Sequence, residues 1–376
     1  MRVKIASRKS DLARIQAYQV GETLKEQNPQ LEVEYFFRES LGDQNLQDPL
    51  WKMPEKGVFT EDFLRGLIEG EFDLVVHSWK DLPTAHREHT EIVGTLTRAD
   101  SRDMILFKKD SIAHFYKNSQ NKLRLFSSSP RREQNLIPFL KEFMPFAVES
   151  VEFSSVRGNV QTRIQKMLDH SEVDGLVVAK AAMDRLLTAE REEFLPTQKR
   201  IREMVGKCNF IVPPLSLCPT AAAQGALAIE IKRDRTDLKG LVKSINCSTS
   251  YLSADLERRW LSRFGGGCHL KIGVSAKAEP YGDILFLRGL APDGKKWEVA
   301  RIERQDPKTI VASQKMWPRP DAPAENEGFF RRVALNKNIQ STVSKSKAVY
   351  ITRESALPSD IQVSHDQWVW TAGCET

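Results

Sequence analysis

One stretch of the chain places a thiol on an open loop. Residues 263–269 read RFGGGCH, so that Cys268 directly follows three glycines. Consecutive glycines are costly to order, and a chain keeps them where its backbone turns tightly or passes close to another group. A lone cysteine beside such a turn is most often a small buried side chain. The alternative is a covalent attachment point. It is favoured by the arginines and lysines elsewhere in the chain, because they could hold a polyanionic group tethered at Cys268.

Two adjacent arginines stand at a predicted helix start. Ser129 is the expected N-cap and Pro130 the first helical residue, after a strand over 123–127. Arg131 and Arg132 then fall in the first turn, where cations oppose the helix dipole. An exposed basic turn is one explanation. An anion bound at the helix N-terminus explains the arginines better. We therefore expect these two arginines, together with Arg157 and Arg163, to act on anions and not on folding.

Other basic residues occupy similar places. They follow predicted strands, begin helices or lie in a neighbouring loop or helix. These basic residues are Arg8, Lys56, Arg157, Arg163 and Arg185. Ser10, which begins the first helix, is a further candidate binding residue.

A lysine and an aspartate follow a buried strand. Residues 72–76 form a mainly apolar run of the buried-strand type, and His77, Ser78 and Trp79 lead from it to Lys80 and Asp81. A lone Lys–Asp pair is usually a surface couple. Its position at the carboxyl end of a buried strand favours a role in binding or catalysis, because ligands of parallel sheets gather at that edge.

The elements that must position these residues alternate along the chain. A strand over 3–7, a helix over 11–26 and a strand over 31–37 form a βαβ opening, which predicts an α/β protein with a mainly parallel sheet. The chain crosses into a second unit around 98–104 and returns through 210–227. A helix over 254–264 leads to the glycines, and strands over 272–276, 284–290 and 296–303 predict a small antiparallel sheet.

Composition sets outer limits. The 376 residues suffice for two or three domains, and 40% hydrophobic and 28% charged residues are ordinary for a globular protein. The net charge of +6 favours acidic partners. Nucleic acid is disfavoured, since no binding motif or aromatic interleaving is present. No apolar run is long enough for a membrane span, and five cysteines without CxxC spacing predict no disulfide framework and no metal site. A reducing cytoplasm is the expected location.

Seven short motifs in order carry a family resemblance. They are ASRKSDLA at 6–13, KGVF at 56–59, HSWKD at 77–81, SSPRR at 128–132, RGNVQTR at 157–163, AQGA at 223–226 and GGC at 266–268. From residue 3 to 304 the chain resembles porphobilinogen deaminase (hydroxymethylbilane synthase).

The resemblance implies three α/β domains. The first two are built like a two-lobed type II periplasmic binding protein, with domain 1 at 1–100 plus a return segment at 209–225, and domain 2 at 101–208. Domain 3, at 226–304, carries the cofactor cysteine and the antiparallel sheet.

The resemblance also implies an activity. A dipyrromethane cofactor is joined through a thioether to Cys268. Four porphobilinogens are condensed head to tail onto it, with loss of ammonia, and are released as hydroxymethylbilane in tetrapyrrole (heme) biosynthesis. Asp81 is the catalytic carboxylate, which contacts pyrrole N–H groups. The residues that hold acetate and propionate side chains are Arg8, Lys56, Lys80, Arg131, Arg132, Arg157, Arg163 and Arg185, and Ser10 and Ser129 are grouped with them as binding residues.

Some positions depart from the family pattern. Leu41 replaces a basic residue, Ala223 a glycine in the hinge-like segment, and Lys271 a proline after the cysteine loop. The alternative function is a non-catalytic two-lobed protein that binds small anions, but the presence of Cys268 and Asp81 argues against it.

The C-terminal stretch is unusual. Residues 305–346 are rich in Pro, Lys, Ser and Asn and are predicted to form a linker. Two predicted strands follow, over 348–353 and 367–371. The first resembles the opening strand of uroporphyrinogen-III synthase, the next enzyme of the pathway. Residues 347–376 are therefore expected to be part of a second enzyme domain, or to dock on the body of the protein.

Overall fold

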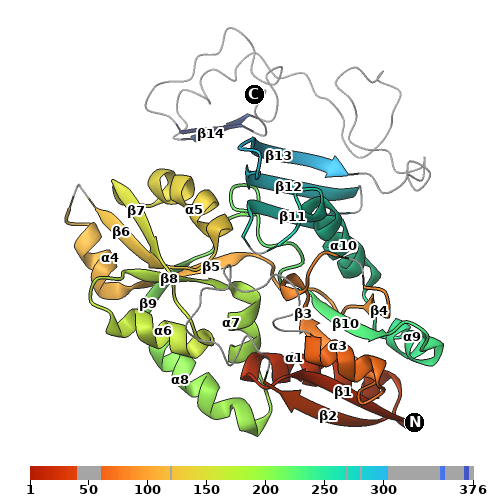
Figure 1. Cartoon of the computed structure of the whole chain (residues 1–376). Helices are drawn as coiled ribbons and strands as arrows, with labels where there is room; N and C mark the ends of the chain where they lie inside the picture. Colours follow the sequence, from red (N-terminus) through yellow and green to blue (C-terminus); the bar gives the residue numbers. More distant parts are fainter. Residues whose placement is uncertain are drawn as a thin grey trace, which may run out of the picture. The chain divides into compact units, whose positions relative to one another are not determined.

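The structure, a computed structural model, describes residues 1–39, 61–85, 87–118, 121–267, 269–279, 282–303, 348–351 and 368–371. The chain forms two compact units, Met1–Thr309 and Ile310–Thr376. The described residues of the first unit form three sheets (Figure 1).

The first sheet has the strand order β2-β1-β3-β10-β4. Its strands are β1 (Arg2–Arg8), β2 (Glu32–Arg38), β3 (Leu74–Ser78), β4 (Thr90–Gly94) and β10 (Leu227–Lys232). On β1, Val3 and Ile5 point to one face, where α1 (Asp11–Gln27) and α9 (Thr236–Lys243) pack. Ala6 points to the opposite face, against α3 (Glu61–Ile68). This alternation is the expected result of the two-residue period of a strand covered on both sides.

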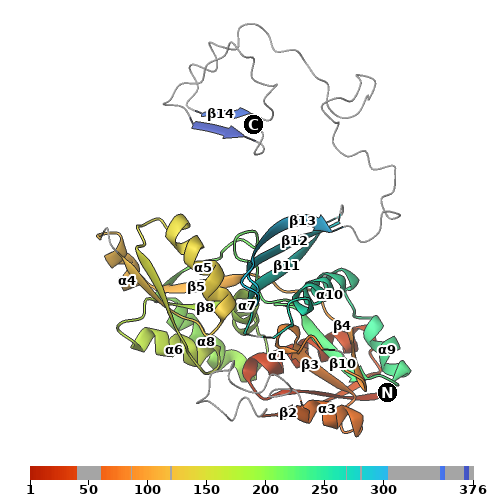
Figure 2. The ribbon, with the colours of Figure 1, turned by 45° about the horizontal axis from the view of Figure 1, so that its top comes forward.

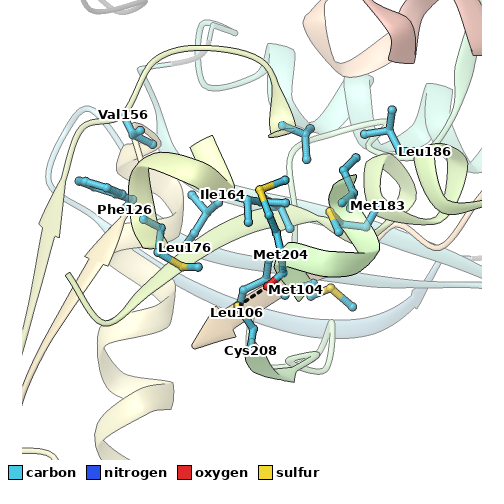
Figure 3. Packing of buried hydrophobic residues seen from close by; sticks show 14 of the residues in the cluster. Met104, Leu106, Phe126, Val156, Ile164, Leu176, Met183, Leu186, Met204 and Cys208 are labelled. Carbon is cyan, nitrogen blue, oxygen red and sulfur yellow. Dashed lines mark hydrogen bonds between the residues drawn. The ribbon is translucent and has the colours of Figure 1, made fainter. Parts of the chain in front are cut away.

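The second sheet has the strand order β7-β6-β8-β5-β9. It matches the first sheet when the fourth strand, which follows a crossing between the two sheets, is left out of the numbering. Its strands are β5 (Asp103–Lys108), β6 (Lys122–Phe126), β7 (Ser150–Ser154), β8 (Gly175–Ala179) and β9 (Cys208–Ile211). The helices α4 (Lys109–Phe115) and α5 (Pro130–Phe143) cover one face. The other face packs on α6 (Val160–Asp169), α7 (Lys180–Leu187), the short η3 (Glu192–Phe194) and α8 (Leu195–Val205). Figure 3 shows the packed side chains there, including Met104 and Leu106 of β5.

One strand in each sheet runs against the other four. β10 is antiparallel to both of its neighbours in the first sheet, and β5 is antiparallel to both of its neighbours in the second. The predictions of an α/β protein and of mainly parallel sheets are confirmed, with this one antiparallel strand per sheet as an addition.

The third sheet is antiparallel. It consists of β11 (Lys271–Glu279), β12 (Gly282–Leu290) and β13 (Lys296–Glu303), and α10 (Ser248–Ser262) packs on it (Figure 2). The antiparallel sheet expected from the sequence is confirmed. The prediction that residues 226–304 form a domain of their own is wrong for the first part of that range, because β10 hydrogen-bonds within the first sheet and α9 packs there too.

In the second unit, β14 (Ala348–Ile351) pairs in parallel with β15 (Trp368–Thr371). The two predicted strands are thus confirmed. Among the described residues of the chain, no helix combines the length and apolar character that crossing a membrane requires.

Candidate active site

The turn after β3 carries the candidate catalytic carboxylate. Residues Trp79–Asp81 form a 3₁₀ turn, η2. Buried Trp79 fixes its start, because its indole is 2% exposed and its backbone N–H donates to the Ala226 carbonyl at 3.1 Å. β1 runs parallel to β3, so Arg8, the last residue of β1, ends at the same edge of the sheet.

Asp81 itself is exposed. Within the described part of the chain, no group donates a hydrogen bond to its carboxylate, which leaves both oxygens available to a ligand. Lys80 beside it is half-buried, and its Nζ donates to Gln224 Oε1 at 3.3 Å. Burial lowers the pKa of Lys80, whereas the charge of Asp81 opposes that shift.

Asp103, the first residue of β5, pairs with both arginines of the α5 start. Its carboxylate is 1% exposed and lies 3.0 Å from Arg131 Nη1 and 2.7 Å from Arg132 Nη2. Gln224 Nε2 donates to the same carboxylate at 2.9 Å. Burial would raise the pKa of Asp103, but the two guanidinium groups outweigh it and lower this pKa well below its usual range.

The expectation that these arginines act on anions and not on folding is therefore wrong as stated. Arg131 and Arg132 are 5% and 8% exposed, and they also donate to the carbonyls of Pro219 and Val177. Removing one arginine would leave Asp103 short of a partner in the interior, which is costly. One carboxylate shared by two guanidinium groups still leaves one positive charge for a ligand.

Two more arginines reach the site from the start of α6. Asn159 is the N-cap and accepts a hydrogen bond from Thr162 N at 2.9 Å, which fixes this helix between Arg157 and Arg163. Burial lowers the pKa of Arg163 to about 10, with Arg132 and Arg157 adding to the shift and Asp81 opposing it. Arg163 therefore stays charged at neutral pH. No carboxylate among the described residues forms an ion pair with it.

The remaining predicted residues differ in their placement. Ser10 and Ser129 are the N-caps that the sequence predicts, but neither side chain makes a capping hydrogen bond. Arg185 is 8% exposed and donates to the Gly225 carbonyl at 2.8 Å, and burial lowers its pKa to about 10. It therefore lies under the return segment, and no described contact joins it to Asp81.

Cys268, Lys56 and Leu41 lie outside the described residues. The glycines before Cys268 are described, and their φ angles are 93°, 71° and 99° at Gly265, Gly266 and Gly267. Such angles favour glycine strongly. A Cβ added at Gly266 would overlap the hydroxyl of Thr84, so the loop turns tightly and also passes close to another segment, as the sequence predicts.

The charges suit a ligand with several carboxylates. Two carboxylates, those of Asp81 and Asp103, act electrostatically on or pair with four cations, which are Lys80, Arg131, Arg132 and Arg163. Two positive charges are in excess. The Nε atoms of Arg132 and Arg163 are buried without a hydrogen-bond partner among the described residues. These donors fit the side-chain carboxylates of a dipyrromethane.

Sequence reasoning missed a buried link behind the site. Glu257 of α10 is fully buried and accepts from both terminal nitrogens of Arg98, at 2.7 and 2.8 Å. It also accepts from the backbone N–H groups of Ala223 and Ala276, at 2.6 and 2.5 Å. The link thus joins both segments between the first two sheets to the third sheet. A charged residue among the buried positions of a helix was the signal that could have pointed to it.

Fold and site together define an α/β protein with a cationic ligand site around one exposed carboxylate. The family model described as "Porphobilinogen deaminase, dipyromethane cofactor binding domain" matches residues 3–240. A porphobilinogen deaminase of Syntrophomonas wolfei is 33% identical over 298 residues, which cover 78% of this chain and 87% of that relative. One of Natranaerobius thermophilus is 32% identical, with 77% and 84% covered, and a probable one of Methanocaldococcus jannaschii is 31% identical, with 76% and 86% covered. The chain belongs to the porphobilinogen deaminase family.

Proposed function

We propose that this chain condenses four porphobilinogen molecules head to tail with loss of four ammonia molecules and, after addition of one water, releases hydroxymethylbilane, with Asp81 as the catalytic carboxylate. Membership of the family supports a transferase of tetrapyrrole biosynthesis. The observation that carries the residue assignment is the pairing of an exposed carboxylate, free of protein hydrogen bonds in the described part of the chain, with surrounding cations in excess.

Asp81 acts on the charge that forms when ammonia leaves. Loss of ammonia from porphobilinogen leaves a cationic methylene-pyrrole, and a fixed carboxylate beside the ring nitrogen stabilises that charge as it develops. Stabilisation that appears only at this stage speeds the reaction, whereas equal stabilisation of bound substrate would not.

The cations position the substrates. Each pyrrole carries two carboxylates, and arginine forks bind carboxylates through two parallel hydrogen bonds. Arg131 and Arg132 act electrostatically on Lys80, Asp81 acts on Arg163, and Arg157 acts on Arg163. Arg8, Ser10, Lys56, Ser129, Arg131 and Arg185 complete the proposed binding set.

Cys268 is the proposed attachment point of the dipyrromethane, which when bound supplies the pyrrole position to which the first substrate is joined. The described glycines support this assignment, because they bring the backbone before Cys268 against Thr84, three residues after Asp81. The chain's own part is to hold the attached group within reach of Asp81.

The wider organisation belongs to the proposal as well. The two five-stranded sheets support two lobes, of residues 1–100 with 209–225 and residues 101–208. With β10 and α9 assigned to the first lobe, the cofactor domain follows α9 and extends to about residue 304. Uroporphyrinogen-III synthase is the proposed partner or fusion partner, on the resemblance of the strand at 348–353. The cytoplasm is the proposed location, because five cysteines without the spacing of a disulfide framework suit a reducing compartment.

Asp81→Asn tests the catalytic assignment. The amide keeps the shape of the side chain but removes its charge, so we expect a folded protein whose turnover is at least about a hundredfold lower. Asp110→Asn, at an exposed position in the first turn of α4, is the matched control and should leave turnover unchanged. Intact mass should show the dipyrromethane adduct in protein from a porphobilinogen-producing host and its loss in Cys268→Ser. Near-normal turnover of Asp81→Asn would transfer the role to another acid, and binding of porphobilinogen without turnover by the unaltered chain would favour the non-catalytic alternative.

A further inference from the structure

One face of α10 packs on the turn that carries Asp81. Tyr251, Ala254 and Arg258 follow one another at helical spacing, so they lie on the same side of the helix. The ring of Tyr251 lies 5.1 Å from that of Trp79, and Ala254 belongs to the buried cluster that contains Trp79 and Leu82.

Arg258 supplies the polar part of this contact. Its Nη1 donates to the carbonyls of Trp79 and Leu82, at 3.2 and 3.0 Å, and its Nη2 donates to the carbonyl of Pro83 at 2.5 Å. These three carbonyls flank Asp81 in sequence, two residues before it, one after it and two after it.

The partners of Arg258 are unusual for a guanidinium. No described carboxylate forms an ion pair with it, whereas the neighbouring Arg259 is exposed and pairs with Asp255 at 2.8 Å. Burial lowers the pKa of Arg258 to about 10, so the group keeps its charge at neutral pH. A planar fork that donates to three carbonyls fixes their relative positions, and a lysine ammonium has no such fixed geometry.

A second contact joins the same two parts of the chain. α10 ends at Ser262, and Gly266 of the following loop lies so close to Thr84 that a Cβ there would overlap the threonine hydroxyl. The segment 79–84 is therefore contacted both by α10 and by the loop that leads to Cys268.

We propose that Arg258 is a positioning residue for the condensation: it holds the turn of Asp81 in register with the helix and loop that precede Cys268. This inference rests on the proposed roles of Asp81 and Cys268. A misplacement of about 1 Å at reacting groups can cost about a hundredfold in rate, so a clamp on the backbone around Asp81 affects turnover without touching the substrate.

The test compares Arg258→Lys and Arg258→Ala with Arg259→Lys and Arg259→Ala in the full-length protein purified with its cofactor. We expect kcat to fall at least about tenfold in both Arg258 variants, with KM for porphobilinogen changed less than about threefold, and both Arg259 variants to behave like the unaltered chain. Millimolar guanidinium should restore part of the kcat of Arg258→Ala, and equimolar ammonium should not. If Arg258→Ala does not fold, Arg258→Lys carries the test.

A readout without turnover separates this inference from the proposed function. In the Cys268→Ser background, amide hydrogen exchange of residues 79–84 should be faster in Arg258→Lys than in Arg259→Lys. Equal kcat in Arg258→Lys and Arg259→Lys, or equal exchange in the two, would overturn the positioning role. A rise in KM alone would overturn it too, because it would indicate ligand binding. Absence of adduct and turnover in the unaltered chain would instead reject the proposed function.

Discussion

At the scale of single residues, Asp103 determines what the arginines of α5 can do. Because it is buried between Arg131 and Arg132, it neutralises one of two charges and fixes both guanidinium groups. Gln224 connects it to Lys80, so the position of the lysine depends on the same carboxylate. The cationic side of the site is thus built on a buried anion, and the arginines serve both fold and ligand.

The sequence predicts the types of these residues but not their partners. Cations at helix starts and a carboxylate after a buried strand are visible in a single chain, and they led to Asp81, Arg132 and Arg163. Asp103 begins a strand 28 residues before Arg131. Only the packing of β5 beside β8, which no local pattern specifies, brings it under α5.

Ala223 has a backbone conformation that glycine would adopt more easily. Its φ is 62°, the only positive value at a non-glycine residue in the described part of the chain. This conformation costs roughly 1–2 kcal/mol for an alanine. Ala223→Gly relieves that cost but loses a buried methyl, about 0.8 kcal/mol, and adds about 0.5–1 kcal/mol of chain entropy. Because the gain and the two losses largely cancel, we expect the free energy of unfolding to change by less than about 0.8 kcal/mol.

Ala228→Gly is the matched control. Ala228 is fully buried in the same cluster but lies in strand β10, where alanine is not strained. Its replacement by glycine therefore brings only the loss of the buried methyl and the added chain entropy, which together destabilise the protein by about 1.5 kcal/mol. Denaturant unfolding of both variants measures the difference. Equal destabilisation of the two variants would show that Ala223 is not strained.

At the scale of elements, a buried charge network ties three neighbouring strands together. Glu230 of β10 is 1% exposed and accepts from Thr90 of β4 at 2.6 Å and from Arg87 at 2.7 Å, while His77 Nε2 of β3 lies 3.0 Å from its carboxylate. Burial would raise the pKa of Glu230, but these partners lower it to about 2. The network fixes the end of β3 just before the turn of Asp81.

This network predicts a pH dependence of stability. The ordinary pKa of the glutamate is 4.5 and its folded pKa about 2, so its contribution is complete above the ordinary pKa and is lost as the pH falls towards the folded pKa. We expect the free energy of unfolding of Glu230→Gln to be lower than that of the unaltered chain at pH 6. This difference should be about 2 kcal/mol smaller at pH 3. Denaturant unfolding at both values measures it, with exposed Glu142→Gln as the control. A deficit that does not change with pH would contradict the lowered pKa.

Elements with clear local signals are predictable, and those defined by distant pairing are not. The helix starts at Ser10 and Ser129 and the antiparallel third sheet follow from capping residues and alternation. No strand is predicted over β10, and the family resemblance assigns this stretch to domain 3. Its place between β3 and β4 depends on His77 and Arg87, more than 140 residues away.

At the scale of the molecule, the two five-stranded sheets have the same strand order, and each receives its antiparallel strand after the chain crosses between them. Arg98 on the outward segment and Ala223 on the return segment both contact Glu257 of α10. The third sheet is bound to the same residue through Ala276. One helix therefore sets the relation of the two crossings and the third sheet.

We expect the second unit to be dispensable for turnover. All residues of the proposed site lie in the unit Met1–Thr309, and a two-stranded sheet such as β14–β15 is marginal by itself. A chain ending at Thr309 should therefore keep the turnover and the melting temperature of the full chain within about 3 °C, since no core of the first unit is removed. A chain ending at Lys295 is the control. It lacks β13, whose Trp297 and Val299 pack against the core of the third sheet, and it should unfold or aggregate through the newly exposed edge of β12. Enzyme assays and thermal unfolding of the three chains separate these outcomes. Loss of turnover on removal of residues 310–376 alone would mean that the second unit takes part in the reaction or in holding the site.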